Sequence, residues 1–179
     1  TNASLLAFTY YATPSVVSVS PSLGPTEGST LLTITGAALN GAGSHRLCRF
    51  DRTATAAVYD PTDGFAGGMV CPSAALATAG TVALQISLNG QQFGPSAVSY
   101  LYYTLPRVSS VHPAAGPTDG GTMVQIRGHG FSAGIGRGIL LRCRFQDTIV
   151  PAVLFSNTRL ACISPELNMS TRALEVSIT

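Results

Sequence analysis

Pro14-Ser-Val-Val-Ser-Val-Ser-Pro21 is followed by Gly24-Pro-Thr-Glu-Gly-Ser-Thr30, and both segments return later in the chain. The second copies read Pro106-Arg-Val-Ser-Ser-Val-His-Pro113 and Gly116-Pro-Thr-Asp-Gly-Gly-Thr122. The offset is 92 residues, which is 106 minus 14. A repeat at a fixed period indicates an array of like structural units, so function must be sought in that array.

The repeat continues beyond these segments. Cys48-Arg-Phe50 returns as Cys143-Arg-Phe145, and Ala83-Leu-Gln-Ile-Ser-Leu88 returns as Ala173-Leu-Glu-Val-Ser-Ile178. The offset changes slightly between these matches, at places where loops between strands tolerate insertion.

The two ends of the chain are out of phase with the repeat, because residues 6–14 resemble residues 98–106. We therefore expect residues 1–12 to be the last strand of an upstream module. Residues 13–104 are expected to form a complete module, and residues 105–179 a second module that lacks its final strand. A fragment cut from a longer array explains these ends. Alternatively, residues 5–11 of one copy supply the missing strand of another copy by β-strand addition.

Composition limits the classes of protein to consider. A length of 179 residues suits one or two domains, and 45% hydrophobic residues excludes a disordered chain. No apolar run of about 20 residues is present, so no membrane-spanning helix is predicted. All ten basic residues are arginine, and a net charge of +2 is too small to imply a nucleic-acid partner. The low charged fraction of 10% fits glycosylation or burial against a partner, and codon bias explains it equally well.

The four cysteines occur as one pair in each unit, Cys48 with Cys71 and Cys143 with Cys162. No short Cys-x-x-Cys spacing of a metal site is present, so we predict one disulfide per unit; buried free thiols are the alternative. Disulfides imply an extracellular, secreted or lumenal location. Asn2-Ala-Ser4 and Asn168-Met-Ser170 are N-glycosylation sequons and predict attached glycans.

Short segments rich in Val, Ile, Leu and Thr, separated by Gly and Pro, predict strands. The expected ranges in the first unit are 15–20, 30–36, 46–51, 54–60, 68–72, 81–89 and 96–103. Those in the second are 107–112, 122–128, 139–146, 149–155, 158–163 and 172–179. Asn89-Gly90 predicts a tight hairpin between two strands. Seven short strands in about 90 residues are typical of an immunoglobulin-like sandwich.

These residues resemble the IPT/TIG domain family, an immunoglobulin-like fold shared by plexins and transcription factors. In the second unit the resemblance rests on Pro106, Val108, Val111, Pro113, Gly116, Pro117, Gly120, Gly121, Thr122, Val124, Ile126, Gly128, Cys143, Phe145, Cys162 and Pro165. The first unit departs from the pattern at Ser29 and at Cys71-Pro72. The resemblance implies an all-β chain of tandem immunoglobulin-like (IPT/TIG) β-sandwiches. It also implies that the cysteines pair within each module.

Motifs for cofactors and catalysis are weak. The two Gly-rich turns lack the lysine of a phosphate-binding loop, and residues 128–133 match a dinucleotide fingerprint without a following helix pattern. Asp60-Pro-Thr-Asp-Gly64 lacks the ligand spacing of a calcium loop. His45, His112 and His129 are isolated. We therefore predict no enzyme activity, no catalytic residue, no cofactor and no metal site.

The first hypothesis is an extracellular or cell-surface glycoprotein whose modules have a structural or adhesive role. Its partners would be neighbouring IPT/TIG modules of the same or another chain and other surface proteins, with filament assembly as one outcome. The second is an intracellular nucleic-acid-binding or enzyme-accessory module, because arginines cluster at residues 46–52 and 137–144. A solvated strand face is the simpler explanation of these arginines.

Overall fold

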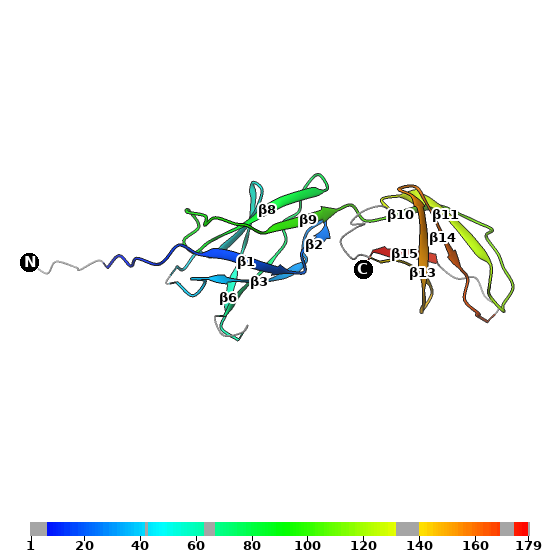
Figure 1. Cartoon of the computed structure of the whole chain (residues 1–179), viewed down its shortest axis with the longest axis horizontal. Helices are drawn as coiled ribbons and strands as arrows, with labels where there is room; N and C mark the ends of the chain where they lie inside the picture. The colour runs from blue at the N-terminus through cyan, green and yellow to red at the C-terminus, as the bar shows by residue number, and fades with distance from the viewer. Residues whose placement is uncertain (1–6, 42, 63–66, 132–139, 169–173, 179) are drawn as a thin grey trace, which may run out of the picture. The chain divides into compact units, whose positions relative to one another are not determined.

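The computed structural model describes residues 7–41, 43–62, 67–131, 140–168 and 174–178. These residues form strands and turns and contain no helix, which confirms the predicted all-β class. The chain divides into two compact units, Thr1–Tyr102 (unit 1) and Tyr103–Thr179 (unit 2). Figure 1 shows the strands of each unit.

Unit 1 is a sandwich of two sheets. The first sheet has the order β1-β3-β7-β6 and the second has the order β2-β9-β8-β4-β5. The strands are β1 (Ser15–Ser20), β2 (Leu23–Pro25), β3 (Leu31–Ala37), β4 (Leu47–Phe50), β5 (Thr53–Ala56), β6 (Val58–Asp60), β7 (Gly68–Pro72), β8 (Gly80–Ser87) and β9 (Ser99–Tyr103). The short strand β2 lies beside β9 (Figure 1).

Unit 2 has the same layers with fewer described strands, in the order β10-β11-β14-β13-β12-β15. Their bounds are β10 (Arg107–His112), β11 (Met123–His129), β12 (Leu141–Phe145), β13 (Thr148–Ser156), β14 (Arg159–Ile163) and β15 (Leu174–Ile178). The first half of β13 pairs with β12 as far as Pro151, and the second half pairs with β14 from Ala152 onward. Strand β13 therefore passes from one layer into the other.

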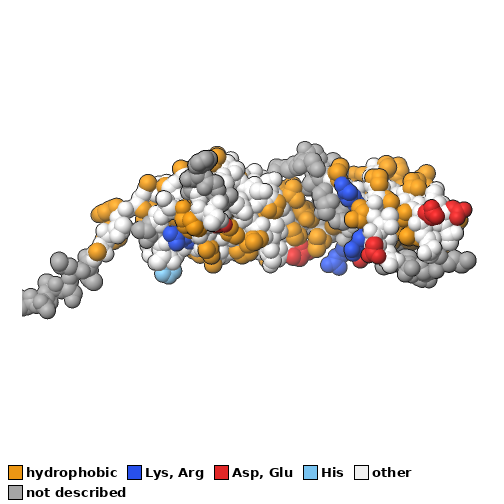
Figure 2. Space-filling view, turned by 90° about the horizontal axis from the view of Figure 1, so that it is seen from below, with side chains coloured by type: hydrophobic (Ala, Val, Ile, Leu, Met, Phe, Trp, Pro, Cys, Tyr) orange, Lys and Arg blue, Asp and Glu red, His pale blue; other side chains and the backbone are white. Residues whose placement is uncertain are grey.

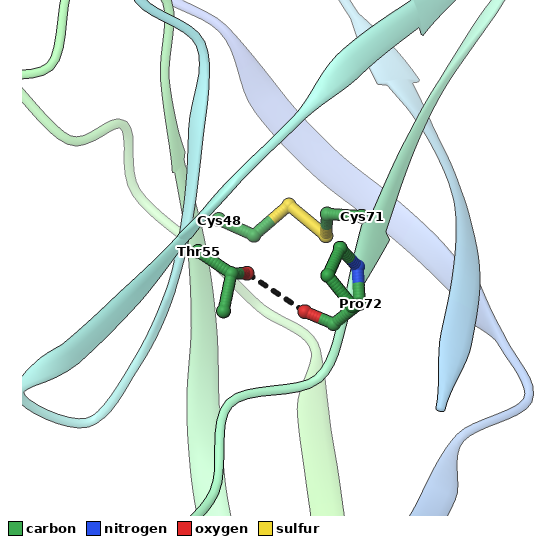
Figure 3. The surroundings of a disulfide bond; sticks show 4 residues. All are labelled: Cys48, Thr55, Cys71 and Pro72. Atoms are coloured by element: carbon green, nitrogen blue, oxygen red, sulfur yellow. Dashed lines mark hydrogen bonds between the residues drawn. A yellow bond between two sulfur atoms is a disulfide. The ribbon is translucent and has the colours of Figure 1, made fainter. Parts of the chain in front are cut away.

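Alternating side chains build the core of each unit. Leu32 and Ile34 of β3 and Cys48 and Phe50 of β4 have no exposed surface, while Arg49 between the last two is partly exposed. This is the two-residue period of a strand with one buried face. The disulfide Cys48–Cys71 joins β4 to β7 across the sandwich, and Thr55 donates a hydrogen bond to the Pro72 carbonyl at 2.7 Å (Figure 3).

The strands observed in unit 1 differ from the prediction in two places. The predicted strand 54–60 divides into β5 and β6, because β5 pairs with β4 in one sheet and β6 pairs with β7 in the other. Ala57 lies at the crossing and donates its N–H to the Arg46 carbonyl at 2.9 Å. The second is β2, which was not predicted because Gly24 and Pro25 are turn residues.

The predicted tight turn at Asn89-Gly90 is wrong, although the two strands that it was expected to join do pair antiparallel. Strand β8 ends at Ser87 and β9 begins at Ser99, so a long loop joins them. The Asn89 carboxamide accepts hydrogen bonds from the N–H groups of Gln91 and Gln92 at 3.0 and 3.1 Å. Asn89 thus organises a local turn inside that loop.

Candidate functional site

The Gly-rich turn of each unit is held by hydrogen bonds to one serine. In unit 1 the Thr30 N–H donates to Ser73 Oγ at 3.1 Å and the Ser29 N–H donates to the Ser73 carbonyl at 2.9 Å. In unit 2 the Thr122 N–H donates to Ser164 Oγ at 3.0 Å and the Gly121 N–H to the Ser164 carbonyl at 2.9 Å. The backbone donors of a phosphate-binding loop are therefore used internally, and the turns are structural.

Glycine is required within these turns by contact as well as by conformation. Gly28 has φ of 77°, and a Cβ atom there would lie 2.7 Å from the Ala75 nitrogen. Gly120 has φ of 75°, and a Cβ atom there would lie 2.6 Å from the Pro165 carbonyl carbon. A side chain at either position would force the turn away from the loop behind it.

The other motifs singled out in the sequence do not converge on one site. Asp60 accepts hydrogen bonds from the N–H and hydroxyl of Thr62, at 2.8 and 2.6 Å, which lower the pKa of its carboxyl. Gly128 lies inside β11, and the last two residues of the fingerprint, 132 and 133, lie outside the described residues. Within the described ranges, no three His, Cys, Asp or Glu side chains gather to hold a metal ion. Likewise, no helix in those ranges has the length and apolar character to cross a membrane.

The two predicted glycosylation sites differ in what the structure describes. Asn168 is exposed at the end of the segment that follows β14. Asn2 lies outside the described residues. Glycosylation at both remains a prediction.

One arginine at the same place in each predicted cluster has a local partner. Arg49 donates from Nε and Nη2 to Gln85 Oε1 at 3.2 and 2.6 Å, and its guanidinium lies 3.8 Å from the centroid of the Phe93 ring. At the equivalent place in unit 2, Arg144 pairs with Glu175. Figure 2 shows few charged side chains on the visible face, most of which is apolar or uncharged.

One sheet of unit 2 presents apolar side chains to solvent. We call Met123, Val153, Phe155 and Ile163 the outer apolar face; their exposed fractions are 57%, 62%, 61% and 52%. Met123 and Ile163 are directly opposite each other on β11 and β14. The four residues contribute to one shallow hollow of about 530 Å³. Sequence reasoning missed this face because β13 reads as a continuous apolar run, which is typical of a strand buried on both faces.

A second hollow in unit 2, of about 370 Å³, lies beneath the Gly-rich turn. We call it the aromatic groove, because the ring of Phe145 lines it. Its lining comes from four parts of the unit: Val111, Pro113–Thr118, Thr122, Val124, Phe145, Ser164, Pro165, Leu167, Asn168 and Leu174. Phe145 is partly exposed there, whereas its counterpart Phe50 in unit 1 is fully buried.

In unit 1 the corresponding space is filled by two tyrosines of β9. Tyr100 and Tyr102 are 0% and 1% exposed, and both rings contact Phe50 edge to face, with centroid distances of 5.6 and 6.0 Å. Burial raises the pKa of both phenols, an effect that neighbouring groups such as the Ser73 hydroxyl oppose only in part. Sequence reasoning placed the strand at 96–103 but did not single out these side chains.

Comparison with known proteins agrees with this architecture. The IPT/TIG domain family matches residues 14–102 and 106–179. Plexin-A2 of Mus musculus is 30% identical over 171 residues, which cover 90% of this chain and 8% of that plexin. Plexin-A4 of Danio rerio is 28% identical over 141 residues, which cover 74% of this chain and 7% of that plexin. The chain thus spans less than a tenth of the length of either relative.

A solved structure of the plexin A4 full extracellular region, domains 1 to 8, overlaps 92% of this chain and 16% of that chain. The TM-score is 0.45 and the sequence identity is 22%. The two disulfides and the plexin relatives place this chain in an extracellular or cell-surface protein. With both repeats matched over nearly their whole length, the chain belongs to the IPT/TIG domain family.

Proposed function

We propose that this chain is a non-catalytic protein-interaction segment of a surface glycoprotein, and that its main contact surface is the outer apolar face of unit 2. The carrying observation is that four large apolar side chains on one sheet are each more than half exposed. Contiguous exposed apolar patches with polar surroundings mark protein contact sites.

Strand register explains how this face arises. Along β11 and β14, Val124 and Cys162 point into the core, so Met123 and Ile163 point outward. Farther along the same outer side, Arg127 lies opposite Arg159. Like charges directly opposite each other destabilise a sheet by a few tenths of a kcal/mol, and an acidic partner would remove that cost. The face therefore has an apolar end and a basic end.

The proposed partners are neighbouring IPT/TIG modules of the same or another chain. Unit 1 supports this choice because its equivalent positions, Leu31 and Val58, are 65% and 69% exposed. Modules of this kind thus share an apolar outer side, although unit 1 has Asp60 where unit 2 has Phe155. Adhesion between surfaces that display the chain is the expected consequence.

Bead aggregation tests the proposal, because multivalent display makes weak contacts measurable. Beads carrying the 179-residue chain are expected to aggregate, and Phe155→Asp is expected to reduce aggregation severely. Phe155 is 61% exposed, so its replacement should leave the far-UV circular dichroism spectrum unchanged. Val58→Asp, which introduces the same charge at the unit 1 position equivalent to Val153, is the control and should have the smaller effect. Equal aggregation by the parent chain and Phe155→Asp would exclude the outer apolar face as the contact surface.

The intracellular alternative has less support. Disulfides such as Cys48–Cys71 and Cys143–Cys162 are rare in the cytosol and nucleus. A nucleic-acid-binding module would also show affinity for DNA that falls steeply as salt is raised. We expect no such affinity, and a filter-binding titration at low and high salt checks this expectation.

A further inference from the structure

We propose that the outer apolar face of unit 2, together with Arg127 and Arg159 at its basic end, binds the equivalent sheet of unit 1 in a second copy of this chain. This inference rests on the proposed function, because it names the partner of the same surface. It commits to one occupant, which the charges on the two sheets identify.

The two equivalent sheets carry opposite charges. In unit 1 the strands β1, β3, β7 and β6 contain one ionisable acid or base, Asp60 at the end of β6. In unit 2 the equivalent strands β10, β11, β14 and β13 contain no carboxylate and three arginines, which are Arg107, Arg127 and Arg159. Because both units have the same arrangement of strands, the fold itself does not require this difference.

These charged side chains lie on the solvent side of their sheets. Asp60 and Val58 share one side of β6, and Val58 is 69% exposed, whereas Tyr59 between them packs against the core of unit 1. Arg127 and Arg159 are directly opposite each other on β11 and β14, and both are exposed. A partner that covers either sheet therefore meets the charge.

In unit 2 the apolar end and the basic end are a fixed distance apart. Met123 is paired with Ile163, and four residues farther along the same two strands Arg127 is paired with Arg159. A strand rises about 3.3 Å per residue, so the two pairs are about 13 Å apart.

Unit 1 has the same spacing with the opposite charge. Leu31 is paired with Pro72, and four residues farther along the strands Thr35 is paired with Gly68. Asp60 is directly opposite Gly68 on the next strand, β6. Sheets that pack face to face lie about 10 Å apart with their strands roughly aligned. In that arrangement the two apolar ends meet each other, and the carboxylate comes within reach of the arginines.

The charges on these sheets are not neutralised within their own units. In the part of the chain that the structure describes, no ion pair includes Asp60, Arg127 or Arg159. Asp60 accepts hydrogen bonds from Thr62, which lower the pKa of its carboxyl and keep it ionised at neutral pH. The two arginines repel each other across the strands, and a carboxylate between them removes that repulsion. Guanidinium groups also match the two oxygens of a carboxylate.

The same charges disfavour contacts between like units. Two unit 2 sheets packed together would bring four arginines close to one another, and two unit 1 sheets would bring two carboxylates together. Juxtaposed like charges act against such pairings. The favoured contact is therefore heterologous, between unit 1 of one copy and unit 2 of another. Contacts of this type close into a ring or continue from copy to copy as a filament.

This charge pattern also accounts for the smaller effect expected of Val58→Asp in bead aggregation. The new carboxylate would lie two residues from Asp60, on the side that faces the arginines of the other copy. Phe155→Asp instead would place a carboxylate next to Ser156, which is paired with Arg159. It would weaken the basic end as well as the apolar contact.

Sedimentation velocity over a concentration series of the 179-residue chain tests the proposal. We expect reversible association that weakens from about 0.15 M to about 1 M NaCl, because the screening length falls from about 8 Å to about 3 Å. Asp60→Arg should weaken association at least about tenfold, and so should Arg127→Asp with Arg159→Asp, because each places like charges in contact. Glu27→Arg is the matched control: it makes the same change of charge at an exposed carboxylate outside the sheet and should leave association unchanged.

Mixing the two charge-reversal variants examines the pairing itself. Each variant alone should stay monomeric, whereas an equimolar mixture should associate as the parent chain does. In the mixture, Arg127 and Arg159 of the first variant meet the unaltered Asp60 of the second. Recovery of association also shows that both variants are folded.

Three results would overturn the inference: a parent chain that is monomeric at every concentration, unchanged association of Asp60→Arg, or no recovery in the mixture. Failure here can be told apart from failure of the proposed function. If Phe155→Asp abolished association and Asp60→Arg left it unchanged, the outer apolar face would stand as a contact surface and unit 1 would be excluded as its partner.

Discussion

Unit 2 is expected to unfold when its disulfide is removed, whereas unit 1 is expected to stay folded when its own disulfide is removed. The Cα atoms of Cys48 and Cys71 are 6.5 Å apart and those of Cys143 and Cys162 are 6.4 Å apart, with sequence separations of 23 and 19 residues. For loops of these lengths the chain-entropy relation gives about 3.4 and about 3.2 kcal/mol at 25 °C. The two replacements therefore remove nearly equal free energies of unfolding.

The outcomes differ because the remaining cores differ. Among the described residues, the buried cluster of unit 1 includes Phe50, Tyr100 and Tyr102 together with eleven other side chains. The corresponding cluster of unit 2 has six members, and two of them are the cysteines themselves. A domain with 5 to 15 kcal/mol of stability survives a loss of about 3 kcal/mol only when its core is ample.

Two readouts separate the units. Five of the six tyrosines belong to unit 1, and the sixth, Tyr103, is the last residue of β9, so tyrosine fluorescence during urea unfolding mainly follows unit 1. Amide hydrogen exchange of peptides from β11 and β14 follows unit 2. We expect C48A/C71A to lower the urea midpoint of the fluorescence transition, and C143A/C162A to abolish protection in β11 and β14. If C143A/C162A kept hydrogen-exchange protection in unit 2 while C48A/C71A lost the fluorescence transition of unit 1, the reasoning from core size would be refuted.

Three further outcomes are expected. Burial raises the pKa of Tyr100 and Tyr102, so above pH 10 these phenols ionise readily only in the unfolded chain. The free energy of unfolding of unit 1 should therefore be constant up to about pH 10 and fall at higher pH. Phenolate absorbance at 295 nm should show two tyrosines that titrate later than the others. Ser29 has φ of 64°, and its counterpart in unit 2, Gly121, has φ of 76°. Glycine adopts such angles without strain, so S29G should raise the free energy of unfolding of unit 1 by about 1 kcal/mol, and G121S should lower that of unit 2 by a similar amount. The urea midpoints of the two variants check both changes. In chain secreted by cultured animal cells, N168Q should remove the mass of one glycan, and an unchanged mass would exclude that site.

Much of the fold follows from the local pattern of residues. The alternation of Leu32 and Ile34 with threonines predicted a half-buried strand, and β3 has that form. Turn residues predicted the boundaries of most strands to within one or two positions. The family resemblance predicted two immunoglobulin-like sandwiches, and the structure and the family match confirm them.

Features that depend on pairing between distant segments were not predictable in this way. Strand β2 exists only because β9 lies beside it, and its own residues are typical of a turn. The division of residues 54–60 depends on which sheet each half joins. The outer apolar face was not predicted, because a strand with apolar residues on both sides does not indicate which side faces solvent.

The sequence by itself determined the repeat, the all-β class and the family, because turn residues and alternating apolar side chains act over a few neighbouring positions. The tertiary structure alone decided which side chains surround each aromatic ring. Phe50 lies in a Cys-Arg-Phe segment that the chain repeats without change, and that segment gives no sign that Tyr100 and Tyr102 cover its ring. Burial is a property of the contacts among segments far apart in the chain, and no local pattern carries that information.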